Sequence, residues 1–319
     1  MPFSHLGLKH VDNTTKDISV VIVNWNTRLY LRACLQSVYS EGTDAEVIVV
    51  DNASTDGSAD MVEKDFPQAK LIRNPANYGF ARAANQGIKA SSGRYVLLLN
   101  PDSKLCPGAL KALIKFADEH PDGGLFGPKI LNADGSLQNS CRRFPTPQAA
   151  LFRNTFLGRL FPKNRYVAEY LMSDWDHNTP KEVDWLSGAA LMLRPKMLEQ
   201  IGLLDERFFM YCEDVDIAYR AKQSGWKAFY FPGATVVHFL AKSSDQAPNK
   251  MILMFHRSMY AFFKKHYAGR WSLFMRLIVP IGVFARAALF ICNNYLHDLL
   301  SLVLRRRKRI LATPKREDQ

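Results

Sequence analysis

The sequence of residues 18–25 is ISVVIVNW, an apolar and largely β-branched run that ends in polar residues. Three similar runs follow at Glu46–Val50 (EVIVV), Ala69–Ile72 and Tyr95–Leu99 (YVLLL). Short apolar runs without polar alternation are typical of strands that are covered on both faces. These four runs therefore predict the buried strands of a parallel sheet.

Helical patterns separate these runs. They lie at Tyr30–Tyr39, Ser58–Asp65 and Phe80–Ala90, so strand and helix alternate through residue 99. This alternation predicts an α/β fold with a mostly parallel, doubly wound sheet. Ligands of such sheets bind beyond the carboxyl ends of the strands, and we expect the functional site at that edge.

Polar residues that can do chemistry follow each of the four predicted strands. They are Asn24 and Asn26, then Asp51 and Asn52, then Asn74 and Asn77, and finally Asn100 and Asp102. Asn and Asp also start turns and cap helices, and that interpretation stays open for each residue taken singly. Their joint placement at four strand ends favours a nucleotide-binding site.

Two acidic stretches are candidates for metal binding and catalysis. Asp102 follows a buried-looking strand, where a carboxylate can hold Mg²⁺ or Mn²⁺ together with substrate phosphates; a turn residue is the alternative. Glu213 and Asp214 open a predicted helix directly after the apolar stretch Phe208–Tyr211. Acids in a first helical turn often only complement the helix dipole, but an apolar wall would desolvate a carboxylate and raise its pKa.

A second motif region, residues 183–244, contains two further candidates. Ser187 and Gly188 form a small-residue turn after Trp185, and glycine there permits a ligand to approach the backbone, with a packing glycine as the alternative. His238 ends a strand-like run. Neutral imidazole is a common metal or phosphate partner, although a lone histidine more often has a structural role.

Six motifs occur in order along the chain. They are VIVNWN (21–26), VDNASTDGS (50–58), NYGFARAANQGI (77–88), LLLNPDS (97–103), WLSGAA (185–190) and FFMYCEDVDIAYR (208–220). Together they resemble a family 2 inverting glycosyltransferase of the A-type fold, in its rhamnosyltransferase-like branch. The resemblance spans residue 18 to about residue 244. It implies transfer of a sugar from a nucleoside diphosphate to an acceptor hydroxyl by a single displacement.

The resemblance implies roles for the residues of the donor site. Asp51, with Asn52 and Asp56 in the same loop, would hold the base and ribose of the nucleotide. Asn77 and Arg82 would lie near the nucleotide-sugar. The full expected nucleotide-sugar set is Asn24, Asn26, Asp51, Asn52, Asp56, Asn77, Arg82 and Asp102.

The resemblance also implies the catalytic and metal-binding residues. Asp214 matches the general base, with Glu213 beside it, while Asp102 and His238 match positions that hold the metal and the diphosphate. The acceptor side would contain Trp185, Ser187 and Gly188. One departure matters, because the family's Asp-x-Asp motif is here Asn100-Pro101-Asp102 and lacks its first acid. We therefore predict weak binding of Mg²⁺ or Mn²⁺ without nucleotide-sugar.

The charge of the chain is concentrated in its C-terminal part. Of 319 residues 47% are hydrophobic, which excludes a disordered chain, and the formal net charge is +12. Residues 257–319 carry 13 basic and three acidic residues. A cationic segment indicates a membrane or a nucleic acid as partner. The basic run at 305–309 follows an apolar stretch without interleaved aromatic residues, so we expect no nucleic acid as partner.

The apolar stretch Trp271–Leu304 is interrupted by charged residues, and its longest uncharged part has 11 residues, Ala287–His297. A spanning helix needs about 20 predominantly apolar residues. We therefore predict an amphipathic helical tail that lies on an anionic membrane surface through residues 271–309. An ordinary core helix with a solvated basic end is the alternative.

Three parts of the chain are expected: a polar extension (1–17), a glycosyltransferase catalytic domain (18–255) and a helical cationic tail (256–319). Residues 1–17 lack the apolar region of a secretory signal. Five widely spaced cysteines without a C-x-x-C pair indicate free thiols in a reducing compartment. Both observations favour a peripheral location on the cytoplasmic face of the membrane.

These inferences combine into a metal-dependent inverting glycosyltransferase. The branch resemblance favours dTDP-rhamnose as donor and a lipid-linked or surface polysaccharide as acceptor. UDP-hexoses stay open as donors, because the sequence does not expose the shape of the sugar pocket. A sugar-nucleotide pyrophosphorylase would have a Gly-rich first loop with lysine, and here that loop is Asn24–Arg28 (NWNTR). A non-catalytic nucleotide-sugar-binding protein would not need Asp51, Asp102 and Asp214.

Overall fold

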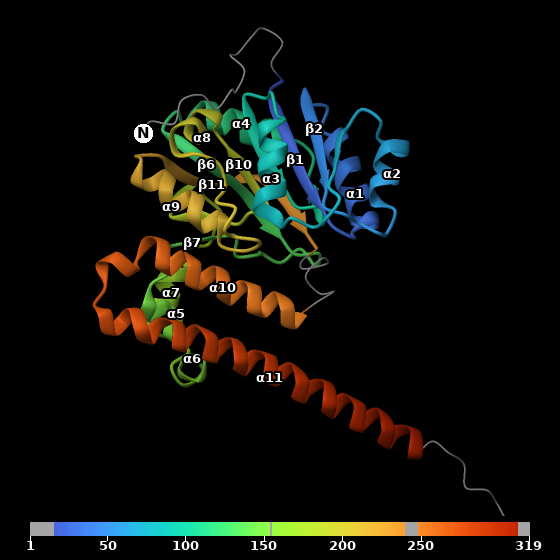
Figure 1. Ribbon diagram of the computed structural model, residues 1–319. Coiled ribbons are helices and arrows are strands. Elements are labelled where there is room, and N and C mark those ends of the chain that lie inside the picture. The colour runs from blue at the N-terminus through green and yellow to red at the C-terminus, as the bar shows by residue number, and fades with distance from the viewer. Residues whose placement is uncertain (1–15, 154, 240–247, 312–319) are drawn as a thin grey trace, which may run out of the picture. The chain divides into compact units, whose positions relative to one another are not determined.

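The computed structural model describes residues 16–153, 155–239 and 248–311 (Figure 1). The chain forms two compact units that divide between Ser243 and Ser244. The expected boundary between residues 255 and 256 falls instead within one continuous helix, α10 (Pro248–His266). The expected polar extension lies outside the described residues apart from Lys16 and Asp17.

A nine-stranded sheet forms the centre of the first unit, in the order β3-β2-β1-β4-β10-β6-β11-β5, with β8 paired to β11. Its strands are β1 (Ile18–Asn24), β2 (Ala45–Asp51), β3 (Lys70–Arg73), β4 (Tyr95–Leu99), β5 (Ser103–Leu105), β6 (Gly123–Leu131), β8 (Lys181–Val183), β10 (Ala190–Leu193) and β11 (Lys227–His238). Only β5, β8 and β10 run antiparallel to their neighbours. The predicted mostly parallel sheet is confirmed, in a mixed form.

Helices cover both faces of this sheet. They are α1 (Arg28–Tyr39), α2 (Ser58–Asp65), α3 (Phe80–Lys89), α4 (Ala109–Asp118), α8 (Pro195–Ile201) and α9 (Glu213–Gln223). Val20 of β1 belongs to a core cluster with Leu31 of α1 and Leu110 of α4. Val21 points to the opposite face, because side chains alternate along a strand, and a Cβ on Gly87 of α3 would overlap it. The sheet is therefore doubly wound, as predicted.

A second, two-stranded sheet pairs β7 (Cys141–Arg142) with β9 (Trp185–Leu186). Between them lie three short helices, α5 (Pro147–Phe152), α6 (Phe156–Leu160) and α7 (Arg165–Leu171), which we call the helical insert (Pro147–Leu171). Each begins with a capping side chain, that of Thr146, Thr155 or Asn164. This side chain accepts a hydrogen bond from the backbone N–H three residues further along the chain. These helices are therefore defined by their caps, since the sequence there has no clear helical periodicity.

The second unit contains α10 (Pro248–His266), a 3₁₀ turn η2 (Ala268–Arg270) and α11 (Leu273–Leu311). Asn294 Nδ2 donates to Asn249 Oδ1 at 2.9 Å and thereby links α11 to α10. The segment 276–296 of α11 has a mean hydropathy of 1.6 and is 6% buried, so by length and composition it meets the requirement for a membrane-spanning helix. Length and composition therefore permit a membrane-spanning helix here, and the surface-lying arrangement of residues 271–309 stays a prediction.

Candidate functional site

A buried polar network joins the ends of β1 and β2. Asn24 and Asp51 face each other in the strand register, and Asn24 Nδ2 donates to Asp51 Oδ1 at 2.9 Å. The other oxygen of Asp51 accepts the N–H of Ser54 at 2.9 Å, and Ser54 Oγ accepts the N–H of Asn26 at 2.9 Å. Asn26 adopts a positive φ of 52°, which its short polar side chain tolerates. These residues shape the loops at the strand ends, as the turn interpretation expected.

Residues after β2 and before α3 connect this network to the segment that precedes α9. Asn52 Nδ2 donates to Asn77 Oδ1 at 3.0 Å and to the carbonyl of Gly79 at 3.1 Å. The next residue, Phe80, donates its backbone N–H to the carbonyl of Phe209 at 2.6 Å. Gly79 has a φ of +84°, and a Cβ there would overlap the Phe209 carbonyl oxygen. Two motifs far apart in the sequence therefore meet through one glycine.

Asp56 and Arg82 occupy the periphery of this region. Asp56 accepts the backbone N–H groups of Arg28 at 2.8 Å and Ser58 at 3.0 Å. Despite partial burial, these hydrogen bonds and that of the Ser58 hydroxyl lower the pKa of Asp56. The exposed guanidinium of Arg82 lies 4.4 Å from the centre of the Tyr78 ring. Their expected contacts with a nucleotide-sugar stay predictions.

The acidic pair opens α9 on a backbone with two unusual conformations. Tyr211 and Cys212 have positive φ values of 70° and 66°, which non-glycine residues adopt only at an energetic cost. Burial raises the pKa of Glu213 well above its usual range, and the adjacent Asp214 carboxylate raises it further. Glu213 is 7% exposed, and its Oε2 has no hydrogen-bond partner within the described residues. Both burial and the neighbouring charge therefore favour the protonated form of Glu213.

Asp214 differs from its neighbour in hydrogen bonding and in exposure. Its Oδ2 accepts the N–H of Gly188 at 3.1 Å, and its Oδ1 accepts the N–H of Val215 at 2.8 Å. Burial raises the pKa of Asp214, while these two N–H groups and the charge of Arg142 oppose the rise. Asp214 is partly exposed and Glu213 is buried. Of the two acids, Asp214 is the one that a substrate hydroxyl can reach.

The segment Gly188–Ala189 lies beside both candidate acids. Gly188 holds Asp214, and the carbonyl of Ala189 accepts the N–H of Asn100 at 2.9 Å and the hydroxyl of Ser103 at 3.3 Å. Because Asn100 and Ser103 flank Asp102, this segment places the loop after β4 next to the start of α9. The structure thereby places the segments that carry Asp102 and Asp214, more than 100 residues apart in the sequence, on either side of Gly188–Ala189.

Asp102 and His238 meet at the end of β11. His238 Nε2 lies 3.2 Å from Asp102 Oδ1 and 3.4 Å from Asn100 Nδ2. The amide of Gln138 uses its Nε2 on Asn132, so its Oε1 faces His238 Nδ1 at 2.8 Å and accepts the Nδ1–H in the assigned tautomer. In the neutral ring this leaves Nε2 as an acceptor beside the carboxylate oxygen, and in the protonated ring Nε2 would donate to that oxygen.

This pair of acceptors fits a divalent cation. A carboxylate oxygen and an imidazole nitrogen suit Mg²⁺ or Mn²⁺ when phosphate oxygens complete the shell. Within the described residues, no three or more His, Cys, Asp or Glu side chains gather into a metal site. Asp102 and His238 therefore stay the predicted metal ligands of this region.

Among the expected acceptor-side residues, Gly188 contacts Asp214, whereas Trp185 is buried. Trp185 Nε1 donates to the carbonyl of Arg143 at 2.9 Å, and its ring packs against the Arg142 guanidinium at 5.1 Å. The N–H of Ser187 donates to the carbonyl of Ser140 at 2.7 Å. Trp185 therefore forms the wall behind the site.

Sequence reasoning missed Gln138 and Arg142. Both lie in a loop-rich stretch without periodicity, and their positions depend on contacts with His238 and Trp185 that lie far along the chain. The consecutive arginines Arg142 and Arg143 before an aromatic residue were the available signal.

Comparisons with known proteins agree with this geometry. The family model "Glycosyl transferase family 2" matches residues 19–167. The N-acetylglucosaminyl-diphospho-decaprenol L-rhamnosyltransferase of Mycobacterium tuberculosis is 31% identical over 296 residues, which cover 88% of this chain and 94% of the relative. The low-salt glycan biosynthesis hexosyltransferase Agl10 of Haloferax volcanii is 30% identical over 66% of each chain.

Among solved structures, the mannosyltransferase PcManGT from Pyrobaculum calidifontis, in complex with GDP-Man and Mn²⁺, matches with a TM-score of 0.52. It is 17% identical, and the match covers 90% of this chain and 81% of that one. This similarity shows a shared fold.

Proposed function

The chain belongs to glycosyl transferase family 2, and from this membership we propose that it transfers L-rhamnose from dTDP-rhamnose to a lipid-linked glycan with inversion at the anomeric carbon. A single observation carries the proposal. Asp214, a partly exposed carboxylate with a raised pKa, is held by Gly188 in the same segment that contacts the Asp102 loop.

Asp214 is suited to the role of general base. Burial brings the pKa of its carboxyl closer to neutrality, while two backbone N–H groups fix the orientation of its oxygens. The carboxylate would remove the proton of the acceptor hydroxyl as the hydroxyl oxygen attacks the anomeric carbon. The bond to the nucleoside diphosphate breaks on the opposite face, so no enzyme nucleophile is needed and the configuration inverts.

Asp102 and His238 are the residues that would hold a divalent cation at the diphosphate. Such an ion, when bound, neutralises negative charge on the leaving group. Gln138 fixes the tautomer and orientation of His238 by accepting its Nδ1–H. The mannosyltransferase of similar fold contains Mn²⁺, which supports the choice of Mg²⁺ or Mn²⁺.

The names of two relatives support the choice of substrates. The mycobacterial relative is named as a rhamnosyltransferase acting on a diphospho-decaprenol acceptor and is similar over most of both chains. The Haloferax volcanii relative is named as a hexosyltransferase, and it supports a hexose as the second candidate for the transferred sugar.

We also propose that the enzyme works on the cytoplasmic face of a membrane. All five cysteines are free, as expected in a reducing compartment. Several large apolar side chains of α11 are exposed, including Leu273 (73%), Ile281 (68%) and Leu289 (69%). Apolar side chains at this density favour contact with lipid.

A donor-hydrolysis and transfer assay tests the proposal. The full chain is incubated with dTDP-rhamnose, UDP-glucose, UDP-N-acetylglucosamine and GDP-mannose, each with EDTA, Mg²⁺ or Mn²⁺. We expect release of nucleoside diphosphate only from dTDP-rhamnose, and only with a metal ion. Release from a UDP-sugar alone would replace the donor, and a product that retains the anomeric configuration would contradict the single displacement.

A further inference from the structure

Two guanidinium groups meet at one aromatic ring beside the candidate base. Arg142 of β7 lies 5.8 Å, and Arg153 after α5 lies 5.2 Å, from the centre of the Tyr170 ring. Arg153 Nη1 lies 3.2 Å from Tyr170 Oη, and Arg142 Nη2 donates to the carbonyl of Asn139 at 3.2 Å. Among residues 16–153, 155–239 and 248–311, Arg142 Nε is buried without a hydrogen-bond partner.

This arrangement leaves guanidinium donors available for an oxyanion. Burial lowers the pKa of Arg153, and the charge of Arg142 lowers it further, so the two cations repel each other. Neither forms an ion pair in the part of the chain that the structure describes, whereas the adjacent Arg143 lies 3.7 Å from Asp184. Arg142 acts on the nearby Asp214 carboxylate through its charge, and the two guanidinium groups can together bind a doubly charged phosphate group through several hydrogen bonds.

The arginine pair is connected to the base through the small sheet. Arg142 is paired with Trp185 in the register of β7 and β9. Ser187 and Gly188 follow this strand, and Gly188 donates to Asp214. An anion on Arg142 therefore lies near the carboxylate that would deprotonate the acceptor.

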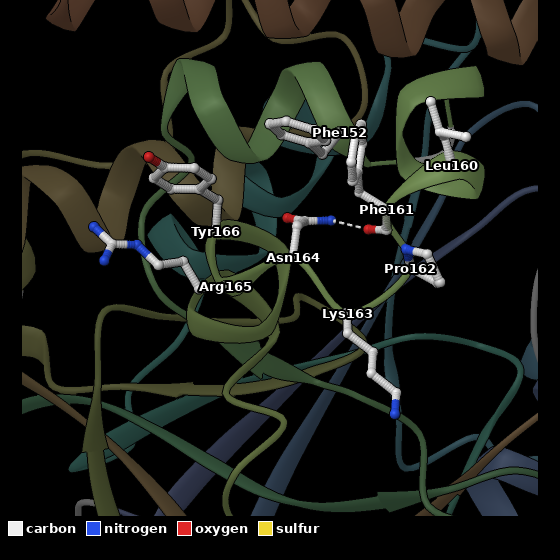
Figure 2. Close-up of a pocket in the computed structure, with 8 residues that line it drawn as sticks. All are labelled: Phe152, Leu160, Phe161, Pro162, Lys163, Asn164, Arg165 and Tyr166. Atoms are coloured by element: carbon white, nitrogen blue, oxygen red, sulfur yellow. Dashed lines mark hydrogen bonds between the residues drawn. The ribbon is translucent and has the colours of Figure 1, made fainter.

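An apolar pocket of the helical insert begins at the residue before Arg153. Phe152 precedes Arg153 and lines a pocket of about 490 Å³ together with Leu160, Phe161 and Tyr166. Figure 2 shows the Phe152 and Phe161 rings side by side, and their centroids lie 6.3 Å apart. Leu160 and Phe161 are 59% and 53% exposed, so the pocket opens to the outside.

The sequence around this pocket is mostly basic. The helical insert, residues 147–171, contains four basic residues and one acidic residue, Glu169. Lys163 and Arg165 belong to the pocket lining, and their side chains point away from its aromatic wall in Figure 2. Such a surface is complementary to a ligand that has an apolar chain and an anionic group.

We propose that this surface binds the polyprenyl diphosphate of the acceptor, with the diphosphate on Arg142 and Arg153 and the isoprenoid chain against Phe152 and Phe161. The inference rests on the proposed function for the lipid-linked nature of the acceptor. The order along the protein is apolar pocket, arginine pair and Asp214. It matches the order of a lipid-linked sugar, which is isoprenoid chain, diphosphate and reacting hydroxyl.

Calorimetry on the full chain tests this site without turnover. The probes are farnesyl diphosphate, farnesol and inorganic pyrophosphate, measured in EDTA with saturating dTDP to keep them from the donor site. Wild type should bind farnesyl diphosphate more tightly than either of the other probes. Arg142→Gln and Arg153→Gln should each weaken farnesyl diphosphate binding by about tenfold or more, as expected for a lost charge-assisted hydrogen bond. Phe161→Ser should weaken farnesyl diphosphate and farnesol but leave pyrophosphate unchanged.

Two control variants make the result specific. Arg143→Gln removes an adjacent positive charge that is paired with Asp184, and it should leave farnesyl diphosphate binding unchanged. Asp102→Asn should also leave it unchanged, because Asp102 belongs to the donor side. Equal losses in Arg142→Gln and Arg143→Gln, or loss in Asp102→Asn, would overturn the inference. Failure of dTDP-rhamnose as a donor would refute the proposed function and leave these binding results as they are.

Discussion

Replacing Asp214 by Asn is the most direct test of the catalytic proposal. The change removes the negative charge and the proton-accepting ability of the side chain while nearly conserving its shape. The amide oxygen can still accept one of the two hydrogen bonds that Gly188 and Val215 now donate, at 3.1 and 2.8 Å. The side-chain NH2 then faces the other backbone N–H, a donor against a donor, but the desolvation cost of the partly buried carboxylate is lost as well, so the fold should persist.

The expected effect on turnover is large. A positioned general base contributes about 10²- to 10⁴-fold in rate, or roughly 3 to 5 kcal/mol of transition-state stabilisation. We expect kcat of Asp214→Asn to fall by at least about a hundredfold. The donor KM should change little, because Asp214 is not among the proposed nucleotide-sugar-binding residues.

The assay measures nucleoside diphosphate release in the presence of acceptor, across a range of pH. The base works only when ionised, and burial raises the pKa of Asp214, so kcat/KM of wild type should fall as the pH drops through that raised pKa. In Asp214→Asn this acid limb should disappear together with most of the rate. Glu213→Gln is the matched variant, one residue away, and should keep most of the turnover and the acid limb.

Two results would refute this reasoning. Near-normal turnover in a folded Asp214→Asn variant would remove Asp214 from the role of base. A large loss in Glu213→Gln, with turnover retained in Asp214→Asn, would assign the proton transfer to Glu213 instead.

Four further predictions concern the surrounding structure. Gly79→Ala should lower the melting temperature and the turnover more than the control Gly135→Ala does. Both glycines have a φ near +84°, but only a Cβ at Gly79 would overlap a backbone carbonyl, that of Phe209. Equal effects of the two variants would contradict this close approach. Glu213→Gln should flatten the pH dependence of the free energy of unfolding. Because the pKa of Glu213 is raised in the folded state, the stability it contributes is complete below about pH 4.3 and decreases with rising pH, by about 1.4 kcal/mol per pH unit, until the folded pKa is passed. The free energies of unfolding from urea titrations at pH 5 and pH 8 should therefore differ less in the variant than in wild type. Calorimetry should detect weak Mn²⁺ binding to the free protein and tighter binding with dTDP present, whereas tight binding to the free protein would argue against the two-ligand site. Neutralising the basic run 305–309 should reduce flotation of the full chain with anionic vesicles but not with neutral ones, and unchanged flotation would reject the electrostatic part of the membrane proposal.

The sequence predicted the first half of the fold closely because its signals are local. Apolar runs of strand length, helices between them and polar residues at the strand ends are all visible within windows of a few residues. The predicted strand at residues 95–99 is β4, and the predicted helix at 58–65 is α2. The same logic predicts that Asp51 and Asp102 lie at one edge of the sheet.

The helical insert and the domain boundary show where local signals fail. Helices α5 to α7 are short and begin with side-chain caps, so no amphipathic period marks them. The predicted boundary between residues 255 and 256 lies inside α10, whose continuity no local signal at these residues indicates.

The sequence by itself determined the strands, the order of the motifs and the identity of the candidate acids, since these depend on residue type and short spacing. The tertiary structure alone decided which side chains meet. His238 reaches Asp102 across 136 residues because β11 pairs antiparallel with β5, and Gly188 reaches Asp214 because β10 enters the sheet between β4 and β6. Strand order and register are set by long-range pairing and burial, which no local window of sequence contains.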